Sequence, residues 1–397
     1  MKELKEGVFW VGATDWKVRH FHGYELSTHR GSTYNAYLIK DEKTVLIDTV
    51  WEPLTDRFIE NLSEVVDPST IDYIIMNHLE PDHSGALPTI MQYCPNATIF
   101  VSKKGQESIN RYYHDNNWKI QVVSNGETLS IGKQDLTFVE ASMLHWPDSM
   151  FTYLEAKKIL FSNDAFGQHF ASSDIFNDEV DETEVYQEAL KYYANILTPF
   201  SKLVTKKIEE LQKLNLPIDI IAPSHGILWR KDPMRIVEKY YEWASGKSEN
   251  SVVIIYNSMW GATHNMAEFI GKGVGQAGVS YKIFNLSTSD RNDVIAEVFK
   301  SKGIILGSST VNNGLLTKLM PVIEDLMGLK FINRVAAAFG SYGWSGESPK
   351  LLEEYLTKAK MKILLDGIKF KYMPNDEELQ QCIEFGKEFA KKMLKES

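Results

Sequence analysis

Four potential metal ligands lie within six positions of the sequence, directly after a short apolar run. The apolar run covers residues 71–76, and the ligands that follow it are His78, Glu80, Asp82 and His83. Neutral imidazole nitrogens and carboxylate oxygens are donors that divalent transition metals accept in proteins. A chain that leaves a strand through a loop containing Pro81 can turn these side chains toward a common point. The segment therefore predicts a metal site.

Three later residues of the same chemical types also follow apolar runs of the kind that form buried strands. These residues are His145, Asp164 and His225. Because loops that leave neighbouring strands can gather on one face of a fold, we expect all seven side chains to meet. Three carboxylates and four neutral imidazoles carry a formal charge of -3, which nearly balances two divalent cations. The set is therefore compatible with two metal ions.

The order and spacing of these residues resemble the metallo-β-lactamase fold, whose signature is a histidine-rich version of the first loop. Glu80 stands where the zinc hydrolases of that superfamily usually carry histidine, and this change is the mark of the flavodiiron proteins. Oxygen donors also move the preference from zinc toward iron or manganese. The resemblance implies one iron held by His78, Glu80 and His145, another held by Asp82, His83 and His225, and a bridge at Asp164. Family members differ on whether the histidine at the position of His83 binds directly, so that contact stays open.

Six histidines remain outside this set, and the default expectation for each is a structural or surface role. Two of them, together with two tyrosines, are candidates for hydrogen bonds to the ligands or to a bound gas. These four candidates are His22, Tyr24, His169 and Tyr193. The sequence leaves both interpretations open.

Small and polar residues at positions 245–251 separate two parts of the chain with different patterns. Beyond them, five apolar runs alternate strictly with five segments of helical spacing, which is typical of a doubly wound parallel sheet of the flavodoxin type. A length of 397 residues also favours two domains. We predict an α/β protein with a metallo-β-lactamase-like αββα sandwich over residues 1–250 and a flavodoxin-like domain over residues 251–397.

A loop rich in small and hydroxyl side chains follows the first strand of the second part and precedes a predicted helix. It contains Ser258, Met259, Trp260, Gly261, Ala262 and Thr263, with no lysine or arginine. Hydroxyls and backbone N–H groups at a helix N-terminus can surround a phosphate, whose charge the helix dipole partly offsets. The loop matches neither the Walker pattern nor Gly-x-Gly-x-x-Gly. Alone, it is equally compatible with an ordinary capped helix.

Two further glycine-containing loops, after the third and fourth predicted strands, favour a flavin. Ligands of open α/β sheets bind at the carboxyl ends of the strands, where all three loops are expected to lie. Trp260 and Trp344 offer aromatic faces to a planar ring. The loops resemble those of flavodoxins, which implies FMN as a cofactor. The candidates for the ring-binding loops are Thr310, Val311, Asn312, Asn313, Ser341, Tyr342, Gly343, Trp344, Ser345 and Gly346.

Together the two resemblances cover nearly the whole chain, in the domain order of the flavodiiron proteins. These oxidoreductases reduce dioxygen to water, nitric oxide to nitrous oxide, or both, with FMN feeding electrons to a non-haem di-iron centre. The resemblance implies the same activity here, but the same ligands serve both gases and leave the preference open. It also implies a head-to-tail homodimer, or a dimer of such dimers, that brings the FMN of one chain near the irons of the other.

The chain contains only two cysteines, Cys94 and Cys382, too few for an iron–sulfur ligand set or a rubredoxin module. Electrons are therefore expected to come from an external donor such as rubredoxin. Two other interpretations remain. One is a zinc hydrolase with a regulatory flavodoxin domain, against which Glu80 argues. The other is an electron-carrying flavodoxin fused to a metal-storage domain, against which the complete ligand set argues.

The charge of the chain and its hydropathy pattern exclude two classes of partner. The formal net charge is -10 and no run is rich in lysine or arginine, so nucleic acid is not an expected partner. The N-terminus lacks the apolar stretch of a secretory signal, and no apolar run is long enough to span a bilayer. We therefore expect a cytoplasmic protein without a membrane partner.

Overall fold

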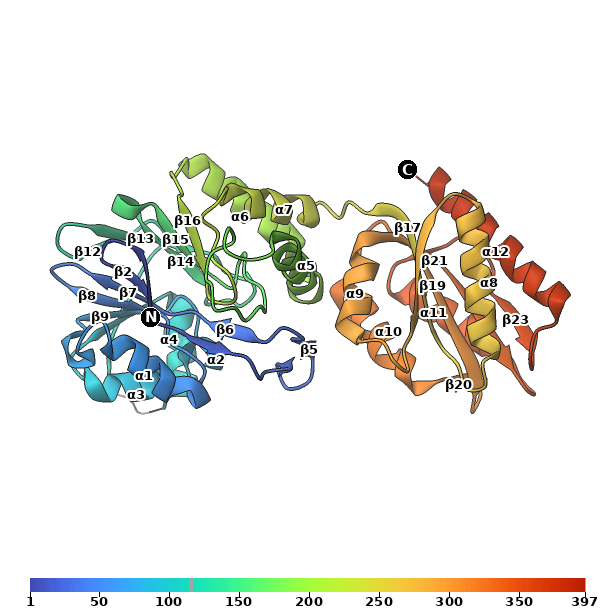
Figure 1. Cartoon of the computed structure of the whole chain (residues 1–397), viewed down its shortest axis with the longest axis horizontal. Coiled ribbons are helices and arrows are strands. Elements are labelled where there is room, and N and C mark those ends of the chain that lie inside the picture. The colour runs from blue at the N-terminus through green and yellow to red at the C-terminus, as the bar shows by residue number, and fades with distance from the viewer. Residues whose placement is uncertain (115–116, 397) are drawn as a thin grey trace. The chain divides into compact units, whose positions relative to one another are not determined.

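A seven-stranded sheet and a five-stranded sheet face each other in the first part of the chain, and a separate parallel sheet forms the second part. The computed structural model describes residues 1–114 and 117–396. The first unit comprises Met1–Tyr192 and Phe200–Tyr241, and the second comprises Tyr193–Pro199 and Glu242–Ser397 (Figure 1). The second unit thus begins before the predicted boundary at 250/251 and includes a short segment from the first half of the chain.

The first sheet of the first unit has the order β1-β2-β7-β8-β9-β10-β11. Its carboxyl-terminal half, from β8 to β11, is parallel. Strands β8, β9 and β10 are buried almost throughout, and parallel strands buried on both faces are apolar along their length, which explains the continuous runs seen in the sequence. The strands are β1 (Lys2–Lys5), β2 (Val8–Trp10), β7 (Tyr37–Lys40), β8 (Thr44–Ile47), β9 (Tyr73–Ile75), β10 (Thr98–Val101) and β11 (Lys119–Val122).

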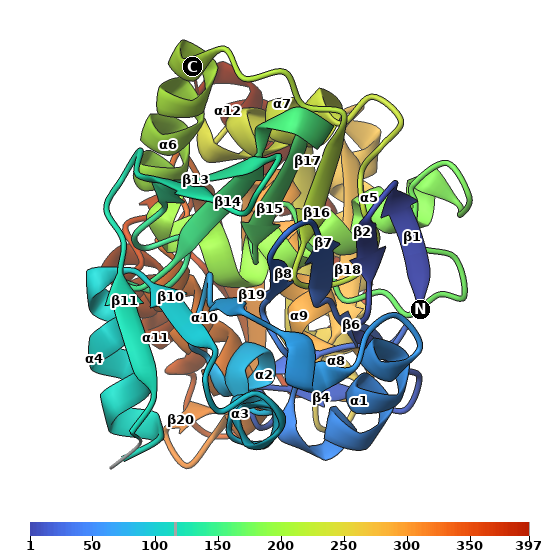
Figure 2. The ribbon, with the colours of Figure 1, turned by 90° about the vertical axis from the view of Figure 1, so that its left-hand side faces the viewer.

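The second sheet has the order β12-β13-β14-β15-β16, and both sheets are visible in Figure 2. Aromatic rings join the two sheets: Phe100 stacks on Phe138 with ring centroids 6.2 Å apart, and Tyr37 lies 5.0 Å from Phe161. One buried apolar cluster thus holds the sandwich together. The strands are β12 (Thr128–Ser130), β13 (Asp135–Glu140), β14 (Met150–Leu154), β15 (Ile159–Asn163) and β16 (Ile220–Pro223).

Helices lie outside both sheets of the first unit, which confirms the predicted αββα sandwich (Figures 1 and 2). Each amphipathic helix turns an apolar stripe to the sheet, as α1 does with Phe58 and Leu62. The helices are α1 (Thr55–Ser63), α2 (Pro81–Ser84), α3 (Leu87–Tyr93), α4 (Lys103–Tyr112), α5 (Glu182–Tyr192), α6 (Ser201–Leu214) and α7 (Met234–Ala244), the last of which continues into the second unit. Two short hairpin-like pairs complete the unit: β3 (Ala13–Asp15) with β6 (Ser32–Tyr34), and β4 (His20–Phe21) with β5 (Leu26–Ser27).

The second unit contains a parallel sheet with the order β18-β17-β19-β21-β22, and β23 continues the last position beside β21. Helices α8 and α12 cover one face, and α9, α10 and α11 cover the other (Figure 1). The predicted doubly wound sheet is confirmed. The strands are β17 (Glu249–Asn257), β18 (Ser280–Asn285), β19 (Ser301–Val311), β21 (Val335–Tyr342), β22 (Lys362–Ile363) and β23 (Ile368–Lys371). The helices are α8 (Ala262–Gln276), α9 (Arg291–Lys300), α10 (Met320–Leu329), α11 (Ser348–Lys358) and α12 (Asp376–Lys395).

Two segments differ from the pattern that the sequence predicts. The helix expected over residues 315–327 begins only at Met320, because β20 (Gly314–Leu315) pairs with the end of β19. The helical spacing expected over residues 184–214 is interrupted after Tyr192 by a π-helix, Tyr193–Leu197. A π-helical turn has more residues than an α-helical turn, so it shifts the side chains that follow it around the axis.

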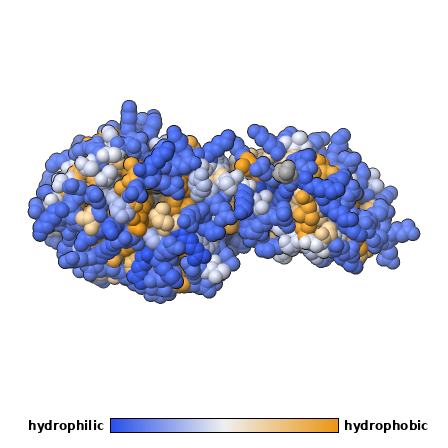
Figure 3. Space-filling view, turned by 90° about the horizontal axis from the view of Figure 1, so that it is seen from above, coloured by the Kyte–Doolittle hydropathy of each residue, from blue (hydrophilic) through white to orange (hydrophobic). Residues whose placement is uncertain are grey.

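The face of the molecule shown in Figure 3 is mainly hydrophilic, with hydrophobic side chains gathered in small patches. This surface is expected when most apolar side chains lie in internal cores. Among the residues that the structure describes, none of the helices combines the length and apolarity needed to cross a bilayer.

Candidate functional site

The predicted metal ligands lie at the ends of strands in both sheets of the first unit. His78 lies shortly after β9, Asp164 directly after β15, and His225 two residues after β16. His145 lies in the loop from β13 to β14. These side chains are buried or nearly so, with His78 at 0% and Asp164 at 1% exposure. Buried ionisable groups of both kinds need partners or metals, so their convergence indicates a site.

The short helix α2 presents the remaining three ligands. Pro81 occupies its first turn, where the fixed φ of proline suits a helix start, and Glu80 is the preceding cap residue. Thr49 donates its backbone N–H and its hydroxyl to the carbonyl oxygen of His83, at 2.9 Å and 2.7 Å. These bonds hold α2 against the sheet, with the side chains of Asp82 and His83 buried.

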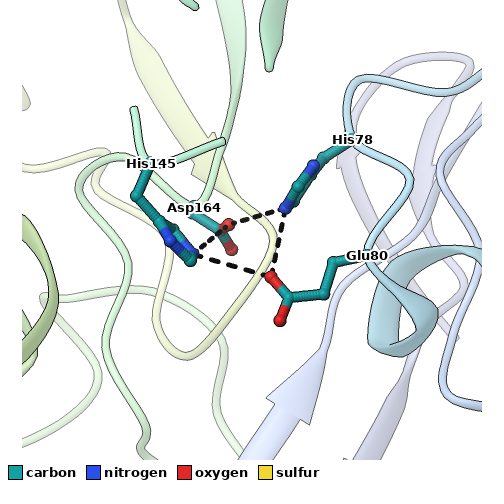
Figure 4. A group of neighbouring side chains, drawn as sticks. All are labelled: His78, Glu80, His145 and Asp164. Carbon is teal, nitrogen blue, oxygen red and sulfur yellow. Dashed lines mark hydrogen bonds and ion pairs between the residues drawn. The ribbon is translucent and has the colours of Figure 1, made fainter. Parts of the chain in front are cut away.

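One group of ligand atoms comprises His78, Glu80, His145 and Asp164, shown in Figure 4. The Nε2 atom of His78 lies 3.2 Å from Glu80 Oε2 and 3.6 Å from Asp164 Oδ2. His145 Nε2 lies 3.4 Å from the same Asp164 oxygen and 3.6 Å from Glu80 Oε2. Each residue thus offers one donor atom, and the four donors lie within 4.8 Å of one another.

A second group comprises Asp82, His83 and His225. His225 Nε2 lies 3.0 Å from Asp82 Oδ2, and His83 Nε2 lies 3.3 Å from the same oxygen. All three side chains are buried. All seven predicted residues thus fall into two neighbouring groups, with Asp164 in the first of them.

Asp164 connects the two groups. Its Oδ2 atom faces His78 and His145, whereas its Oδ1 atom lies 3.0 Å from His83 Nε2 and 3.7 Å from His225 Nε2. Both oxygens are buried and neither accepts a hydrogen bond from the described residues, although imidazole nitrogens surround them. A buried carboxylate without hydrogen bonds is costly. Two cations, one beside each oxygen, would satisfy it, so the donor set fits a pair of metal ions.

The electrostatics of the cluster agree with cation binding. Burial raises the pKa of Asp164, but the neighbouring His83 and His145 side chains outweigh it and hold the pKa well below its usual range. Burial lowers the pKa of His83, whereas Asp82 and Asp164 raise it, and the balance lies at about 9. Without a metal, Asp82 and Asp164 thus favour the protonated form of His83. A metal cation can replace that proton, because ligating imidazoles are neutral.

Two imidazoles of the cluster are oriented through their second nitrogen. His78 Nδ1 lies 3.0 Å from Asp148 Oδ2, which also accepts the backbone N–H of Leu79 at 2.8 Å. His225 Nδ1 donates to the carbonyl oxygen of Thr33 at 2.6 Å. Both contacts leave the Nε2 atoms directed at the carboxylates. Such bonds commonly fix the ring orientation of histidines that bind metals.

The two additional histidine candidates both lie beside the cluster. His22 Nε2 lies 2.9 Å from Glu80 Oε1, on the oxygen that does not face the other ligands. The ring of His169 lies 5.0 Å from that of His225, and its Nδ1 atom lies 2.9 Å from the hydroxyl oxygen of Ser32. These two residues are therefore placed to affect the ligands or a bound molecule.

The two tyrosine candidates lie elsewhere. Tyr24 is 83% exposed and its ring contacts His20. Tyr193 packs against Trp243 and Phe299 within the second unit. Two other tyrosines lie beside the cluster: the ring centroid of Tyr34 lies 5.6 Å from that of His225, and the ring centroid of Tyr192 lies 5.3 Å from that of His169.

A cavity of about 350 Å³ opens beside the cluster and reaches Glu80 and Asp82. Its wall includes Phe21, Tyr34 and Trp51, whose rings stack in sequence with centroids 5.8 Å and 6.1 Å apart. An aromatic wall favours small apolar molecules over water, and carboxylates at the end of the cavity mark the reactive side.

The predicted phosphate loop joins β17 to α8 in the second unit. Gly261 has a φ of 89°, a left-handed conformation that glycine adopts without strain, and its N–H donates to Ser258 Oγ at 3.2 Å. Thr263 Oγ1 lies 2.9 Å from Ser309 Oγ and 2.8 Å from Ser341 Oγ. These hydroxyls bring the three predicted loops together at the N-terminus of α8. The arrangement fits an FMN phosphate, which hydroxyl and backbone N–H donors can surround.

The predicted ring-binding residues lie at the carboxyl ends of β19 and β21. Asn312 and Asn313 both have positive φ, 51° and 57°, and form the two-residue turn from β19 to β20. Trp260 and Trp344 are 86% and 79% exposed. Exposed tryptophans at the ligand-binding edge of such a sheet fit a planar ring that would cover them.

Comparisons with known proteins agree with both halves of this description. The family described as ODP family beta lactamase matches residues 33–226, and the flavodoxin family matches residues 254–386. The chain is 48% identical to a nitric oxide reductase of Moorella thermoacetica, over 98% of this chain and 97% of the relative. It is 46% identical to the anaerobic nitric oxide reductase flavorubredoxin of Escherichia coli, over 98% of this chain and 81% of that protein.

Solved structures agree over the whole chain. The rubredoxin oxygen:oxidoreductase of Desulfovibrio gigas aligns with a TM-score of 0.96 and 37% identity, over 99% of this chain and 98% of that one. The flavodiiron protein of Giardia intestinalis aligns with a TM-score of 0.95 and 34% identity, over 99% and 96%. The chain belongs to the flavodiiron protein family. As a flavodiiron protein it is an oxidoreductase that uses FMN and a di-iron centre, and the two sites described above fit these groups.

The flavodiiron site also contains residues that sequence reasoning missed. Asp148 lies in the same loop as His145, so a carboxylate beside a ligand was a usable signal. The carbonyl of Thr33 and the ring of Tyr192 carried no signal, because their contacts depend on the tertiary fold.

Proposed function

We propose that the seven clustered residues bind two irons that reduce nitric oxide to nitrous oxide, dioxygen to water, or both. One iron is assigned to His78, Glu80 and His145, the other to Asp82, His83 and His225, with Asp164 between them. The observation that carries this assignment is the pair of Asp164 oxygens, each directed at a different ligand group. The contact of His83 Nε2 with Asp164 supports the assignment of His83 as a direct ligand of the second iron.

The electron count matches this chemistry. When bound, reduced FMN supplies two electrons and a di-iron(II) pair two more, which equals the four needed to convert dioxygen to water. Two nitric oxide molecules need only two electrons to yield nitrous oxide and water. The protein contributes a cavity that admits small apolar gases, and His22 holds the outer oxygen of Glu80. The ligands would hold two cations side by side, and paired cations stabilise the negative charge that develops as such gases are reduced.

The test is metal analysis together with gas consumption. Protein produced in iron-replete cells should contain about two irons per chain and should consume nitric oxide or dioxygen when FMN is reduced. Nitric oxide is the first substrate to test, because relatives at 46–48% identity are named for its reduction. Stoichiometric zinc with hydrolase activity would instead establish the hydrolase interpretation. Bound iron without gas turnover would establish a storage role.

A rubredoxin is the proposed electron donor, and the cytoplasm is the proposed location. The relative from Desulfovibrio gigas is named as a rubredoxin oxygen:oxidoreductase. Reduced rubredoxin should reduce the FMN of this protein and sustain turnover. If rubredoxin fails where a chemical reductant supports turnover, the donor is of another class.

The proposed assembly is a head-to-tail homodimer in which each chain's FMN serves the other chain's irons. A flavin from another chain could approach the irons through a groove of about 920 Å³ in the first unit. Trp146 lines this groove, and its ring centroid lies 5.4 Å from that of the ligand His78, so the groove leads to the metal cluster. The test mixes a chain carrying His78→Ala and His145→Ala with a chain carrying Ser258→Ala and Thr263→Val, at an FMN concentration too low to occupy the doubly substituted loop. Mixed dimers should regain one active pair. If subunits exchange without restoring activity, electrons travel within one chain.

A further inference from the structure

A buried carboxylate lies behind only one of the two ligand groups. Asp148 is 2% exposed. Its Oδ2 atom lies within hydrogen-bond distance of His78 Nδ1, at 3.0 Å, and accepts a hydrogen bond from the backbone N–H of Leu79 at 2.8 Å. Its Oδ1 atom is buried and has no hydrogen-bond partner among the described residues. A buried carboxylate therefore faces the back of one metal-binding imidazole.

In the other group, no carboxylate is hydrogen-bonded to the second nitrogen of an imidazole within the part of the chain that the structure describes. His225 Nδ1 donates to the Thr33 carbonyl, which is a neutral acceptor. His83 Nδ1 has no hydrogen-bond partner among the described residues. The nearby buried Asp48 accepts the backbone N–H of Asn77 at 2.7 Å, and no imidazole hydrogen bond to it is seen over residues 1–114 and 117–396. The two ligand groups are therefore chemically similar, but the partners of their imidazole Nδ1 atoms differ.

We propose that Asp148 is a positioning residue that makes the two irons unequal, stabilising the ferric state of the iron on the His78 side. A carboxylate hydrogen-bonded to an imidazole increases the basicity of the ring, and a more basic ligand favours the higher metal charge. With iron bound, Asp148 would favour loss of the first electron from the metal held by His78, Glu80 and His145. This inference rests on the proposed di-iron site, and it goes beyond it by assigning an order to the two metals.

Asp148→Asn can remove the negative charge without removing the hydrogen bonds, because of the way in which the carboxylate is bonded. One oxygen accepts both hydrogen bonds, and the other has none from the described residues. The amide oxygen of asparagine can therefore keep both bonds, while its NH₂ group occupies the unpaired position. The substitution removes the charge and retains the shape. His22, which contacts Glu80 on the same side of the site, is present in both proteins and cancels in the comparison.

The experiment is a redox titration of the iron-loaded, full-length protein enriched in ⁵⁷Fe, followed by electron paramagnetic resonance and Mössbauer spectroscopy. In Asp148→Asn, the ferric-to-ferrous equilibrium of one iron should shift about tenfold toward ferrous, which equals about 59 mV for a one-electron step. The other step should change by less than about threefold. Asp135→Asn removes an exposed charge from β13 of the same unit and should shift neither step. Equal shifts at both irons, or none at either, would overturn the proposal.

A second variant keeps the test decisive if Asp148→Asn loses metal. Asp148→Glu restores the charge, so it should retain iron and show midpoint potentials closer to those of the parent than Asp148→Asn does. Selective loss of the iron on the His78 side in Asp148→Asn, with FMN retained, supports the proposal. Equal loss of both irons, or identical behaviour of the two variants, rejects it. Absence of two irons from the parent protein would instead refute the proposed function.

Discussion

The metal cluster and the flavin loops differ in the kinds of side chain that they contain and in how exposed these side chains are. The cluster consists of charged side chains that are almost entirely buried and that contact one another across long sequence separations. The flavin loops consist of hydroxyls, asparagines and turns, carry no lysine or arginine in the phosphate loop, and expose two tryptophans. The first site is thus complete within the protein apart from its cations. The second is an open surface that a large ligand would cover.

This difference predicts how each site responds to damage. Removal of one buried ligand leaves several charged neighbours without a partner. The resulting loss of metal-binding free energy is large and affects the whole cluster. Removal of one contact from the flavin loops leaves the other contacts in place. Substitutions in the cluster should therefore abolish binding, whereas substitutions in the flavin loops should weaken it by steps.

The largest effect is expected for Asp164→Ala. Both ligand groups lose the oxygen that faces them, and the imidazoles of His83 and His145 lose a counter-charge. Iron content should fall for both metals, and gas reduction should fall by at least about 100-fold. Flavin absorbance should stay unchanged, because the FMN loops belong to the other unit. Iron analysis and the visible spectrum provide the measurement, with Asp135→Ala as an exposed control. Full turnover with both irons bound would show that Asp164 is not a ligand.

Much of the metal site was predictable because its ligands lie beside strand ends. A loop that follows a buried strand has a known edge of the sheet to occupy, so the convergence of His78, Asp164 and His225 could be expected from the sequence alone. The position of Asp148 in the loop of His145 was a signal that this carboxylate lies near the site, but only the tertiary fold shows that its partner is His78.

The helical period did not decide between the two roles left open for Tyr193. The spacing through residues 184–214 places Tyr193 on the same face as Leu190 and Leu197, and this spacing carries no signal for the packing of Tyr193 against Trp243 and Phe299. The flavin loops were predictable in position for the same reason as the metal loops. Their contacts, such as the hydroxyl group of Thr263 between two serines, required the fold.

A moderate effect is expected for Thr263→Val in the flavin loops. Valine preserves the shape of threonine but removes the hydroxyl that lies against Ser309 and Ser341. Two serine hydroxyls lose a buried partner, and a phosphate loses one donor. FMN affinity should fall by about tenfold, which corresponds to about 1.4 kcal/mol. Fluorescence titration of the flavin-free protein measures this change, and the iron content should be unaltered. Thr357→Val, on the exposed side of α11, is the matched control.

If Thr263→Val binds FMN as tightly as the parent, the hydroxyl group is not part of the phosphate site. If it releases FMN completely, the flavin site depends on single side chains as strongly as the metal cluster does. The second result would contradict the stepwise response expected of an open surface.

The smallest effect is expected for Trp344→Phe, because it alters an exposed side chain and preserves an aromatic face. Trp344 is 79% exposed, so its substitution should change the free energy of unfolding by no more than about 0.5 kcal/mol. A smaller ring stacks on less of the flavin, and part of an aromatic contact worth about 1 kcal/mol should be lost. FMN should therefore bind about threefold more weakly, with a changed flavin fluorescence. Trp16→Phe alters a tryptophan of the first unit that is 56% exposed and should leave FMN binding unchanged. Identical FMN affinity and fluorescence in Trp344→Phe and the parent would show that this ring does not contact the flavin, and the exposed tryptophan would then belong to another surface of the protein.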